Sequence, residues 1–344
     1  MHRLLFVSAH YGEPSPGRLI HGDQQCLLRG EHIKMTIARR VSEAFSWRYH
    51  YATEKLVHQS RRVRRRVVFL DLHDILTALG SFGPSGFKIL FVHSSLSACG
   101  TIQGGPQTVV TALSKWTGER TVAMPTHAYC YPDENGNVPV YRDDESVSLV
   151  GAITDHFWRQ PDVIRSKHPT HSIASAGPES QAICEGHEFC ETPFGAGTPY
   201  ERMIEKGTGV LMFGAKMDSY TLFHTAEDAA RATYLYESQP YGLLVANPDG
   251  TTRSVRTWRQ DNRVRRRFGE MDEWLEQRGL LKRRKLGCGE LLFIPSAQDV
   301  HEAVIEKIWK CPLFLVAPLF RSQVERAVQS DSRIADHNQT QIGR

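Results

Sequence analysis

The 344-residue sequence contains no apolar run near the roughly 20 residues that a transmembrane helix requires. Its first residues, MHRLLFVSAHYGEPSPG, hold only a short apolar stretch, which breaks too early for the hydrophobic region of a secretory signal peptide. Both absences predict a protein that does not enter a membrane and that works in the cytoplasm.

The sequence also lacks a cysteine pattern that would indicate disulfide bonds. The chain has seven cysteines, an odd number, and no two of them are spaced as CxxC. A chain of this length can bury a sufficient core without disulfide bonds, so we expect the thiols to be mostly buried and unreactive.

A strong excess of one sign of charge is also absent, because the 42 Lys and Arg residues nearly balance the 38 Asp and Glu residues and leave a net charge of +4. The arginines nevertheless cluster in two runs, which are Arg61, Arg62, Arg64, Arg65 and Arg66, and Arg263, Arg265, Arg266 and Arg267. Each run is compatible with nucleic-acid contact or with attraction of an anionic cofactor, but a solvated surface is the simplest interpretation. Neither run has interleaved aromatics or a known nucleic-acid module, so we expect no nucleic-acid partner.

The composition and the apolar pattern of the chain change near Val67. Residues 1–66 are polar and rich in His and Arg, with one plausible helix around 31–57, and we expect an amino-terminal extension of uncertain order. Residues 67–318 have the regular apolar pattern of a folded domain, and residues 319–344 form a polar tail that is expected to fray.

Within the predicted domain, strand and helix patterns alternate. Short apolar runs predict buried strands at 88–93, 121–125, 171–177 and 209–214. Helical spacing predicts helices at 71–80, 106–118, 147–161 and 225–237. Such alternation favours an α/β sandwich with a parallel or mixed sheet.

Residues 240–294 differ and predict a β-rich insert or subdomain. They contain a β-hairpin that turns at Asp249-Gly250 and, after a helix near 268–279, a returning strand at 286–295. A last helix is expected at 299–310.

A serine- and glycine-rich turn follows the first buried strand. It runs from His93 to Gly100 as HSSLSACG, and Gly104 precedes the next predicted helix. Small residues let the backbone approach a phosphate or a pantetheine arm, and a helix start offers unpaired N–H groups. The turn is neither a Walker A motif nor a dinucleotide fingerprint. A turn with internally satisfied hydroxyls is the alternative interpretation.

Two further segments carry groups for acid–base chemistry. In RSKHPTHS, Pro169 forces His168 into an extended conformation, and an imidazole is a natural base near pH 7. In HTAED, His224 and Glu227 lie on one helix face, where the carboxylate would orient a base or receive a cationic substrate. The alternatives are a structural histidine and a polar first helical turn. No closely spaced third ligand indicates zinc, and we expect no metal.

Taken in order, these segments resemble the aminoglycoside 3-N-acetyltransferase (antibiotic N-acetyltransferase) family. The similarity covers roughly residues 67–318, and RSxHPxxS, from Arg165 to Ser172, is its most specific element. The resemblance implies an α/β sandwich distinct from the GNAT fold, with a β-rich carboxy-terminal part. It also implies an acetyltransferase that uses acetyl-CoA as co-substrate.

The resemblance assigns roles to individual residues. Together with the serine-rich turn, it gives a coenzyme A channel formed by His93, Ser94, Ser95, Leu96, Gly100, Gly104, Pro125, Thr126, Arg165, Ser166 and Ser172. It implies that His168 is the general base and that Glu227, beside Asp228, receives the cationic acceptor; His171 and His224 complete the predicted acceptor site. The Thr126 hydroxyl, or a backbone N–H beside Ser94, would stabilise the oxyanion.

One departure concerns the acceptor. Classical members of the family tend to carry an acidic residue directly after the His-Pro pair, where this chain has Thr170. An aminoglycoside, a related amino sugar and another small biosynthetic amine therefore all stay open, as does a homodimer. Two other classes are weighed beside the transferase. One is a metal-dependent hydrolase using His168, His171, His224 and Glu227, and the other is a non-catalytic coenzyme A or nucleotide sensor.

Overall fold

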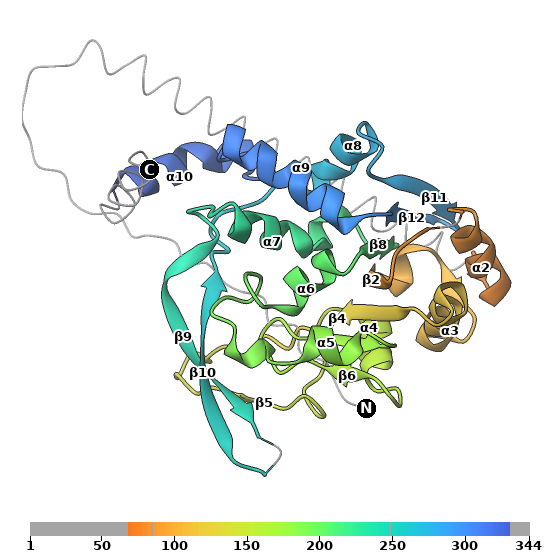
Figure 1. Ribbon diagram of the computed structural model, residues 1–344, viewed down its shortest axis with the longest axis horizontal. Helices are drawn as coiled ribbons and strands as arrows, with labels where there is room; N and C mark the ends of the chain where they lie inside the picture. Colours follow the sequence, from red (N-terminus) through yellow and green to blue (C-terminus); the bar gives the residue numbers. More distant parts are fainter. Residues whose placement is uncertain (1–67, 84, 248, 331–344) are drawn as a thin grey trace, which may run out of the picture. The chain divides into compact units, whose positions relative to one another are not determined.

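The computed structural model describes residues 68–83, 85–247 and 249–330 (Figure 1). The predicted amino-terminal extension, with its helix around 31–57, lies outside the described residues, as does most of the predicted polar tail. In the described part of the chain, no helix has both the length and the apolar character needed to cross a membrane.

A seven-stranded mixed sheet lies at the centre of the fold (Figure 1). Its strands, from one edge to the other, are β11 (Lys282–Leu286), β12 (Gly289–Ile294), β8 (Thr208–Phe213), β2 (Ile89–Ser94), β4 (Thr121–Pro125), β7 (Ile173–Ala176) and β6 (Ile164–Arg165). The central strand β2 pairs in parallel with both β8 and β4. The remaining pairs are antiparallel. The predicted mixed sheet is confirmed.

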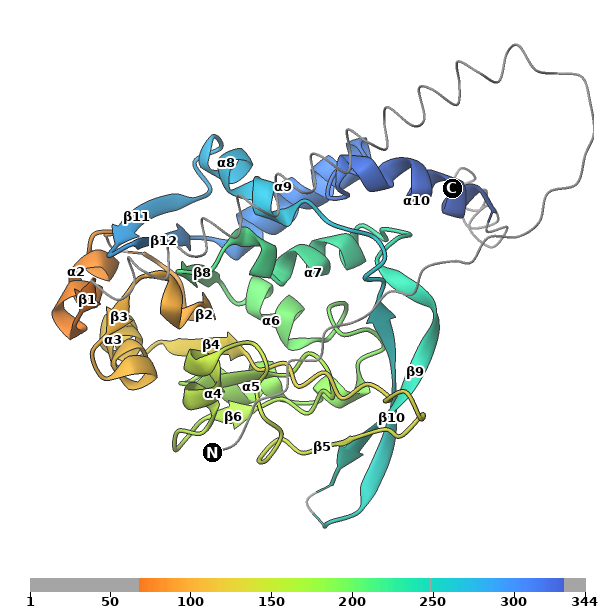
Figure 2. The ribbon, with the colours of Figure 1, turned by 180° about the vertical axis from the view of Figure 1, so that it is seen from behind.

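Strand β2 shows why helices cover both faces of this sheet. Ile89 and Phe91 enter one hydrophobic core, whereas Leu90 and Val92 enter the other, because successive side chains of a strand point to opposite faces. The second core is closed by α2 (Leu72–Gly80), α3 (Gly105–Thr117) and α4 (Ala152–Trp158). The first is closed by α5 (Ser180–Cys184), α6 (Pro199–Glu205), α7 (Leu222–Ala229), α8 (Met271–Glu276) and α9 (Ala297–Lys310). The result is a three-layer α/β sandwich, seen from behind in Figure 2.

Two small sheets lie outside the central one. Strands β1 (Phe69–Leu70) and β3 (Thr101–Ile102) pair in parallel. The predicted hairpin is formed by β9 (Tyr236–Ala246) and β10 (Thr252–Gln260), and β5 (Val140–Tyr141) pairs with β9. Gly250 has a φ of 83° at the hairpin turn, a conformation that glycine adopts without strain. The β-rich segment 240–294 is thus divided, since β11 and β12 belong to the central sheet.

The bounds of two predicted helices are wrong, and part of the segment predicted to fray is helical. The helix expected at 147–161 is only Ala152–Trp158, because Gly151 just before it has a φ of 131°. The helix expected at 225–237 runs from Leu222 to Ala229; Arg231, at a φ of 54°, turns the chain toward β9. Residues expected to fray after Pro318 form α10 (Pro318–Ser330). Because α4 begins only at Ala152, residues 147–151 form a loop, and part of this loop lines the cavity described below.

Candidate active site

A cavity of about 800 Å³ opens where β2, β4 and β8 end. Of the residues predicted from the sequence, it is lined by His93, Ser94, Ser95, Leu96, Pro125, His171 and His224. Residues 149–151 of the loop before α4, the first helical residue Ala152, and residues 218–221 after β8 complete much of its wall. A site at the carboxyl ends of adjacent parallel strands is the usual position in open α/β sheets.

Gly100 and Gly104, both predicted to approach coenzyme A, also have backbone conformations that favour glycine. Gly104 is the N-cap of α3 and has a φ of 74°, and a Cβ there would lie 2.4 Å from the Thr108 hydroxyl. Gly100 has a φ of 140° and packs on the carbonyl of Val68. Neither glycine is among the residues that line the cavity.

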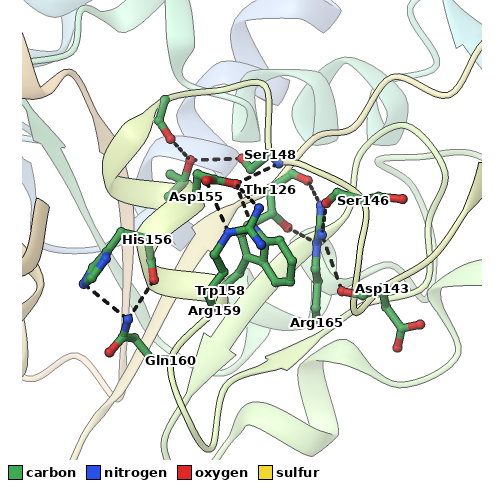
Figure 3. Close-up of polar contacts among 12 residues, drawn as sticks. Thr126, Asp143, Ser146, Ser148, Asp155, His156, Trp158, Arg159, Gln160 and Arg165 are labelled. Atoms are coloured by element: carbon green, nitrogen blue, oxygen red, sulfur yellow. Dashed lines mark hydrogen bonds and ion pairs between the residues drawn. The ribbon is translucent and has the colours of Figure 1, made fainter.

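Arg165 connects two loops, because its buried guanidinium bonds Thr126 in one and Ser146 in the other (Figure 3). Its Nε donates to the Thr126 hydroxyl at 3.1 Å, one Nη donates to the Thr126 carbonyl at 2.6 Å, and the other donates to the Ser146 carbonyl. The guanidinium also stacks over Trp158 at 4.6 Å and lies 5.3 Å from the Tyr141 ring. Arg165 and Trp158 line a separate hollow of about 430 Å³. Neither residue lines the 800 Å³ cavity.

The serines of the RSxHPxxS segment are committed to similar bonds. The Ser172 hydroxyl donates to the Thr126 carbonyl at 2.7 Å. Ser166 accepts from the backbone N–H of Ile173 at 2.9 Å and contacts Nδ1 of His187 at 2.9 Å. These contacts fix the shape of the segment and hold the side chains away from the cavity wall.

His168 lies inside the same segment and is 2% exposed. Its Nδ1 accepts a hydrogen bond from the backbone N–H of His171 at 3.0 Å, which places the ring proton on Nε2, 3.3 Å from the Thr257 hydroxyl. The ring stacks on His187 at 4.4 Å. Burial lowers the pKa of His168 to about 3. Both nitrogens therefore have internal partners, and the residue does not line the cavity.

His224, by contrast, lines the cavity and is held by a carboxylate. Its Nδ1 lies 2.7 Å from Oε2 of Glu227, one helical turn further along α7. Glu227 is fully buried, and its other oxygen accepts from Nε of Arg266 at 3.3 Å. Arg266 is in turn fixed by the backbone carbonyls of Tyr234, Leu235, Asp261 and Val264. The result is a buried chain of Arg266, Glu227 and His224 that ends at the cavity.

The charges in this chain determine its protonation. Burial pushes the pKa of Glu227 upward, but the cation of Arg266 and the bond from His224 outweigh it, so the pKa stays below its usual value. Burial lowers the pKa of His224, and Glu227 partly opposes that shift. Near pH 7 the carboxylate is ionised and the imidazole is neutral. Its Nδ1–H points at Glu227, which leaves the lone pair on Nε2.

Comparison with known proteins agrees with this geometry. The family model described as aminoglycoside 3-N-acetyltransferase matches residues 91–306. The chain belongs to this family. Membership confirms the predicted fold and enzyme class, an acyltransferase with acetyl-CoA as co-substrate.

Individual relatives span most of the chain. Aminoglycoside N(3)-acetyltransferase VIII of Streptomyces fradiae is 28% identical over 271 residues, which cover 72% of this chain and 88% of the relative. Aminoglycoside N(3)-acetyltransferase VII of Streptomyces paromomycinus is 31% identical over 216 residues, 57% of this chain and 70% of the relative. The crystal structure of the AAC(3)-IVa apoenzyme matches with a TM-score of 0.62 at 25% identity, covering 72% of this chain and 92% of that one. A histidine-to-alanine variant of that enzyme has been solved in complex with a gentamicin.

The cavity of the acetyltransferase is also lined by residues that the sequence did not indicate. Among them are His127, Tyr129, Phe194, Asp218 and Tyr220. His127 lies two residues after the end of β4, and Asp218 and Tyr220 lie after β8, so a position after a strand end is the available signal. Nε2 of His127 lies 2.9 Å from the Tyr200 hydroxyl. The Tyr129 hydroxyl lies 3.0 Å from its Nδ1.

Asp228 is one of the residues predicted to receive the acceptor, yet its carboxylate is bound elsewhere in the acetyltransferase. It accepts from the hydroxyls of Thr192, at 2.9 Å, and Tyr236. Burial raises its pKa, and it is not among the residues that line the cavity.

As to the alternative of a metal-dependent hydrolase, no group of three or more His, Cys, Asp or Glu residues is placed to hold a metal ion within the described ranges.

Proposed function

We propose that the protein transfers the acetyl group of acetyl-CoA to an amine of an amino sugar, with His224 as the general base. The observation that carries the proposal is the 2.7 Å contact between His224 and Glu227 at the cavity wall. A base oriented by a buried carboxylate is the arrangement that activates nucleophiles in many acyl-transfer enzymes. We therefore move the role from His168, the residue indicated by the motif, to His224.

The reaction needs one protein base and no covalent acetyl-enzyme, and the acceptor nitrogen loses two protons. Nε2 of neutral His224 takes the first from the acceptor ammonium, and the freed amine attacks the acetyl carbonyl carbon, forming the C–N bond. When the tetrahedral intermediate collapses, the C–S bond breaks, the imidazolium returns its proton to the leaving thiolate, and the second nitrogen proton is released to water. Glu227 stabilises the imidazolium in between, because its carboxylate stays ionised beside Arg266.

The cavity wall suits the two substrates in different ways. Ser94, Ser95, Leu96 and Pro125, all predicted to bind coenzyme A, lie at the ends of β2 and β4 and present small or uncharged side chains. A pantetheine arm fits such a wall, since it carries amides and no charge. Among the described residues that line the cavity, Asp218 is the one carboxylate. We assign the acceptor's remaining positive charge to Asp218, in place of Glu227 and Asp228.

Turnover on an amine panel tests the proposed function. Thiol release from acetyl-CoA is measured with aminoglycosides, single amino sugars and unrelated primary amines, and mass spectrometry locates the added acetyl group. Acetylation of at least one amino sugar is the expected result. Tight binding of acetyl-CoA without turnover on any amine would favour the alternative of a non-catalytic sensor.

Asp218→Asn should raise the KM for the acceptor about tenfold, because an ammonium in a partly dry cavity loses its counter-charge. The KM for acetyl-CoA should change less than twofold. Asp228→Asn is the matched control, since its carboxylate is bound to Thr192 and Tyr236 away from the cavity. Equal increases in both Michaelis constants would show that Asp218 supports the wall and does not receive the acceptor.

The pH dependence tests the chain of Arg266, Glu227 and His224. For the wild type, log kcat/KM should rise with pH and level off, with its inflection below the ordinary histidine value of 6.5, because only neutral His224 accepts a proton and burial lowers its pKa. Glu227→Gln should move the inflection to lower pH, since the carboxylate favours the imidazolium. Arg266→Gln should move it to higher pH, since the guanidinium disfavours it.

The charged and titratable groups around His224 are Glu227, Arg266, His127 and His171, and the last two stay neutral because burial lowers their pKa values. Arg263→Gln is the control for the arginine variant, because Arg263 is exposed and pairs with Asp261 and not with Glu227. Shifts of the same sign in the Glu227 and Arg266 variants would contradict the proposed chain.

A further inference from the structure

The proposed transfer requires hydrogen-bond donors for the acetyl carbonyl oxygen, which becomes negatively charged in the tetrahedral intermediate. The donors predicted from the sequence are already in use. The Thr126 hydroxyl is buried between Ser172, at 3.2 Å, and Nε of Arg165, at 3.1 Å. The backbone N–H of Ser95, beside Ser94, donates to the carbonyl of Phe213 at 2.8 Å. Other groups must meet the oxyanion.

Three buried polar atoms of cavity-lining residues have no hydrogen-bond partner among the described residues. They are the hydroxyls of Ser94 and Tyr220 and Nε2 of His93. Ser94 belongs to the wall already assigned to the pantetheine arm, which leaves Tyr220 and His93. Tyr220 is 1% exposed and His93 is 2% exposed, and both side chains line the cavity. A buried polar group without a partner destabilises a fold, so several of them beside one cavity indicate that a ligand supplies the missing bonds.

The fold brings these two side chains together from adjacent parallel strands. His93 lies near the end of β2, and Tyr220 follows the short turn after β8. Their rings are 6.1 Å apart. Tyr220 packs on Phe223 at 4.5 Å and His93 packs on Phe91 at 4.6 Å, which holds both rings in place. Rigid donors of this kind need no reorganisation when charge develops.

Both groups are uncharged near pH 7. Burial raises the pKa of Tyr220, so its hydroxyl keeps its proton. Burial lowers the pKa of His93 to about 3, so the ring is neutral. In the tautomer protonated at Nε2, His93 donates from the atom that lacks a partner.

We propose that Tyr220 and His93 form the oxyanion site of this acetyltransferase, with the Tyr220 hydroxyl and the His93 Nε2–H donating to the acetyl carbonyl oxygen. The inference rests on the proposed function, because it needs the acetyl thioester to lie at the ends of β2 and β8. Neither group gains or loses a proton during the transfer. The carbonyl π electrons move to oxygen as the amine attacks, and they return as the C–S bond breaks.

Tyr220→Phe keeps the ring and removes the donor. We expect kcat to fall about 10–100-fold while the KM for acetyl-CoA changes less than threefold, since the bond strengthens as the oxyanion forms. Tyr241→Phe is the matched control, because it also removes one tyrosine hydroxyl, but that hydroxyl bonds Glu237 and does not line the cavity. It should keep the wild-type kcat. Equal kcat values for the two variants would overturn the proposal.

A binding experiment tests the same site without an acceptor. Calorimetry compares acetyl-CoA with coenzyme A, which lacks the carbonyl. In the wild type, acetyl-CoA should bind at least about fivefold more tightly, the equivalent of one neutral hydrogen bond. In Tyr220→Phe the ratio should approach one, with the affinity for coenzyme A unchanged. An unchanged ratio in a variant that binds both ligands would refute the oxyanion site. Failure of the wild type to bind acetyl-CoA would instead refute the proposed function.

Discussion

Replacing His224 with alanine should lower kcat by about two to four orders of magnitude, the usual contribution of a general base. The acceptor amine arrives protonated, and without the imidazole its proton must leave to water. The dissociation constant for coenzyme A should change little, because the base acts on the acceptor. Stopped assays of acetyl transfer at saturating substrates, together with calorimetry of coenzyme A, measure the two quantities.

Two other histidines are the controls for this experiment. His168→Asn keeps an acceptor for the backbone N–H of His171 and should retain most of the turnover, with the inflection of the pH profile unchanged. His171→Ala removes a second imidazole from the cavity wall but none that is held by a carboxylate, and it should lose less than tenfold. A folded His224→Ala protein with near-normal rates, or a collapse of activity in His168→Asn alone, would return the role to His168.

The central sheet could be predicted because its signal is local. In β2, four consecutive apolar residues, 89–92, are long enough for a strand buried on both faces and too short for a core helix. The end of α7 could not be predicted in the same way. Apolar spacing continues past Ala229, and the turn at Arg231, with its φ of 54°, depends on how β9 then pairs with β10.

The candidate site likewise has features that the local sequence predicts and features that depend on distant residues. The spacing of His224 and Glu227 on one helix face is a local property, so the contact between them could be expected. Pro169 fixes the backbone of His168, but the ring faces inward because it meets Thr257, 89 residues further along the chain. Local sequence gives a segment's conformation, whereas the direction in which its side chains face is decided by distant packing.

The arginine run at 263–267 shows this limit most clearly. Its simplest interpretation was a solvated surface, and Arg263, with 74% of its side chain exposed, agrees with that. Arg266, three residues later, has a 6% exposed side chain and pairs with Glu227. Nothing in the run distinguishes the two arginines, because the difference comes from a carboxylate 39 residues away.

The buried histidines make the fold sensitive to acid. Burial lowers the pKa of His93, His127 and His168 to about 3, and it lowers those of His171 and His187 well below 6.5. In the unfolded chain these groups titrate near 6.5, so above that pH neither state binds their protons and the stability is complete. As the pH falls below 6.5, the unfolded state takes up protons that the folded state refuses, and the free energy of unfolding decreases.

The loss should be large enough to unfold the protein before its carboxylates titrate. A histidine with a folded-state pKa of about 3 costs about 2 kcal/mol at pH 5, and several such groups together approach the 5–15 kcal/mol that stabilises a typical domain. Urea denaturation followed by tryptophan fluorescence at pH 7.5, 6.5, 5.5 and 5 should therefore show a steepening decrease, with unfolding between about pH 5.5 and 4.5. His168→Asn removes one of these groups and should make the decrease shallower. A free energy of unfolding that stays constant from pH 7 to 5 would mean that these rings already accept protons in the folded state, since a buried histidine that stays neutral cannot avoid this linkage.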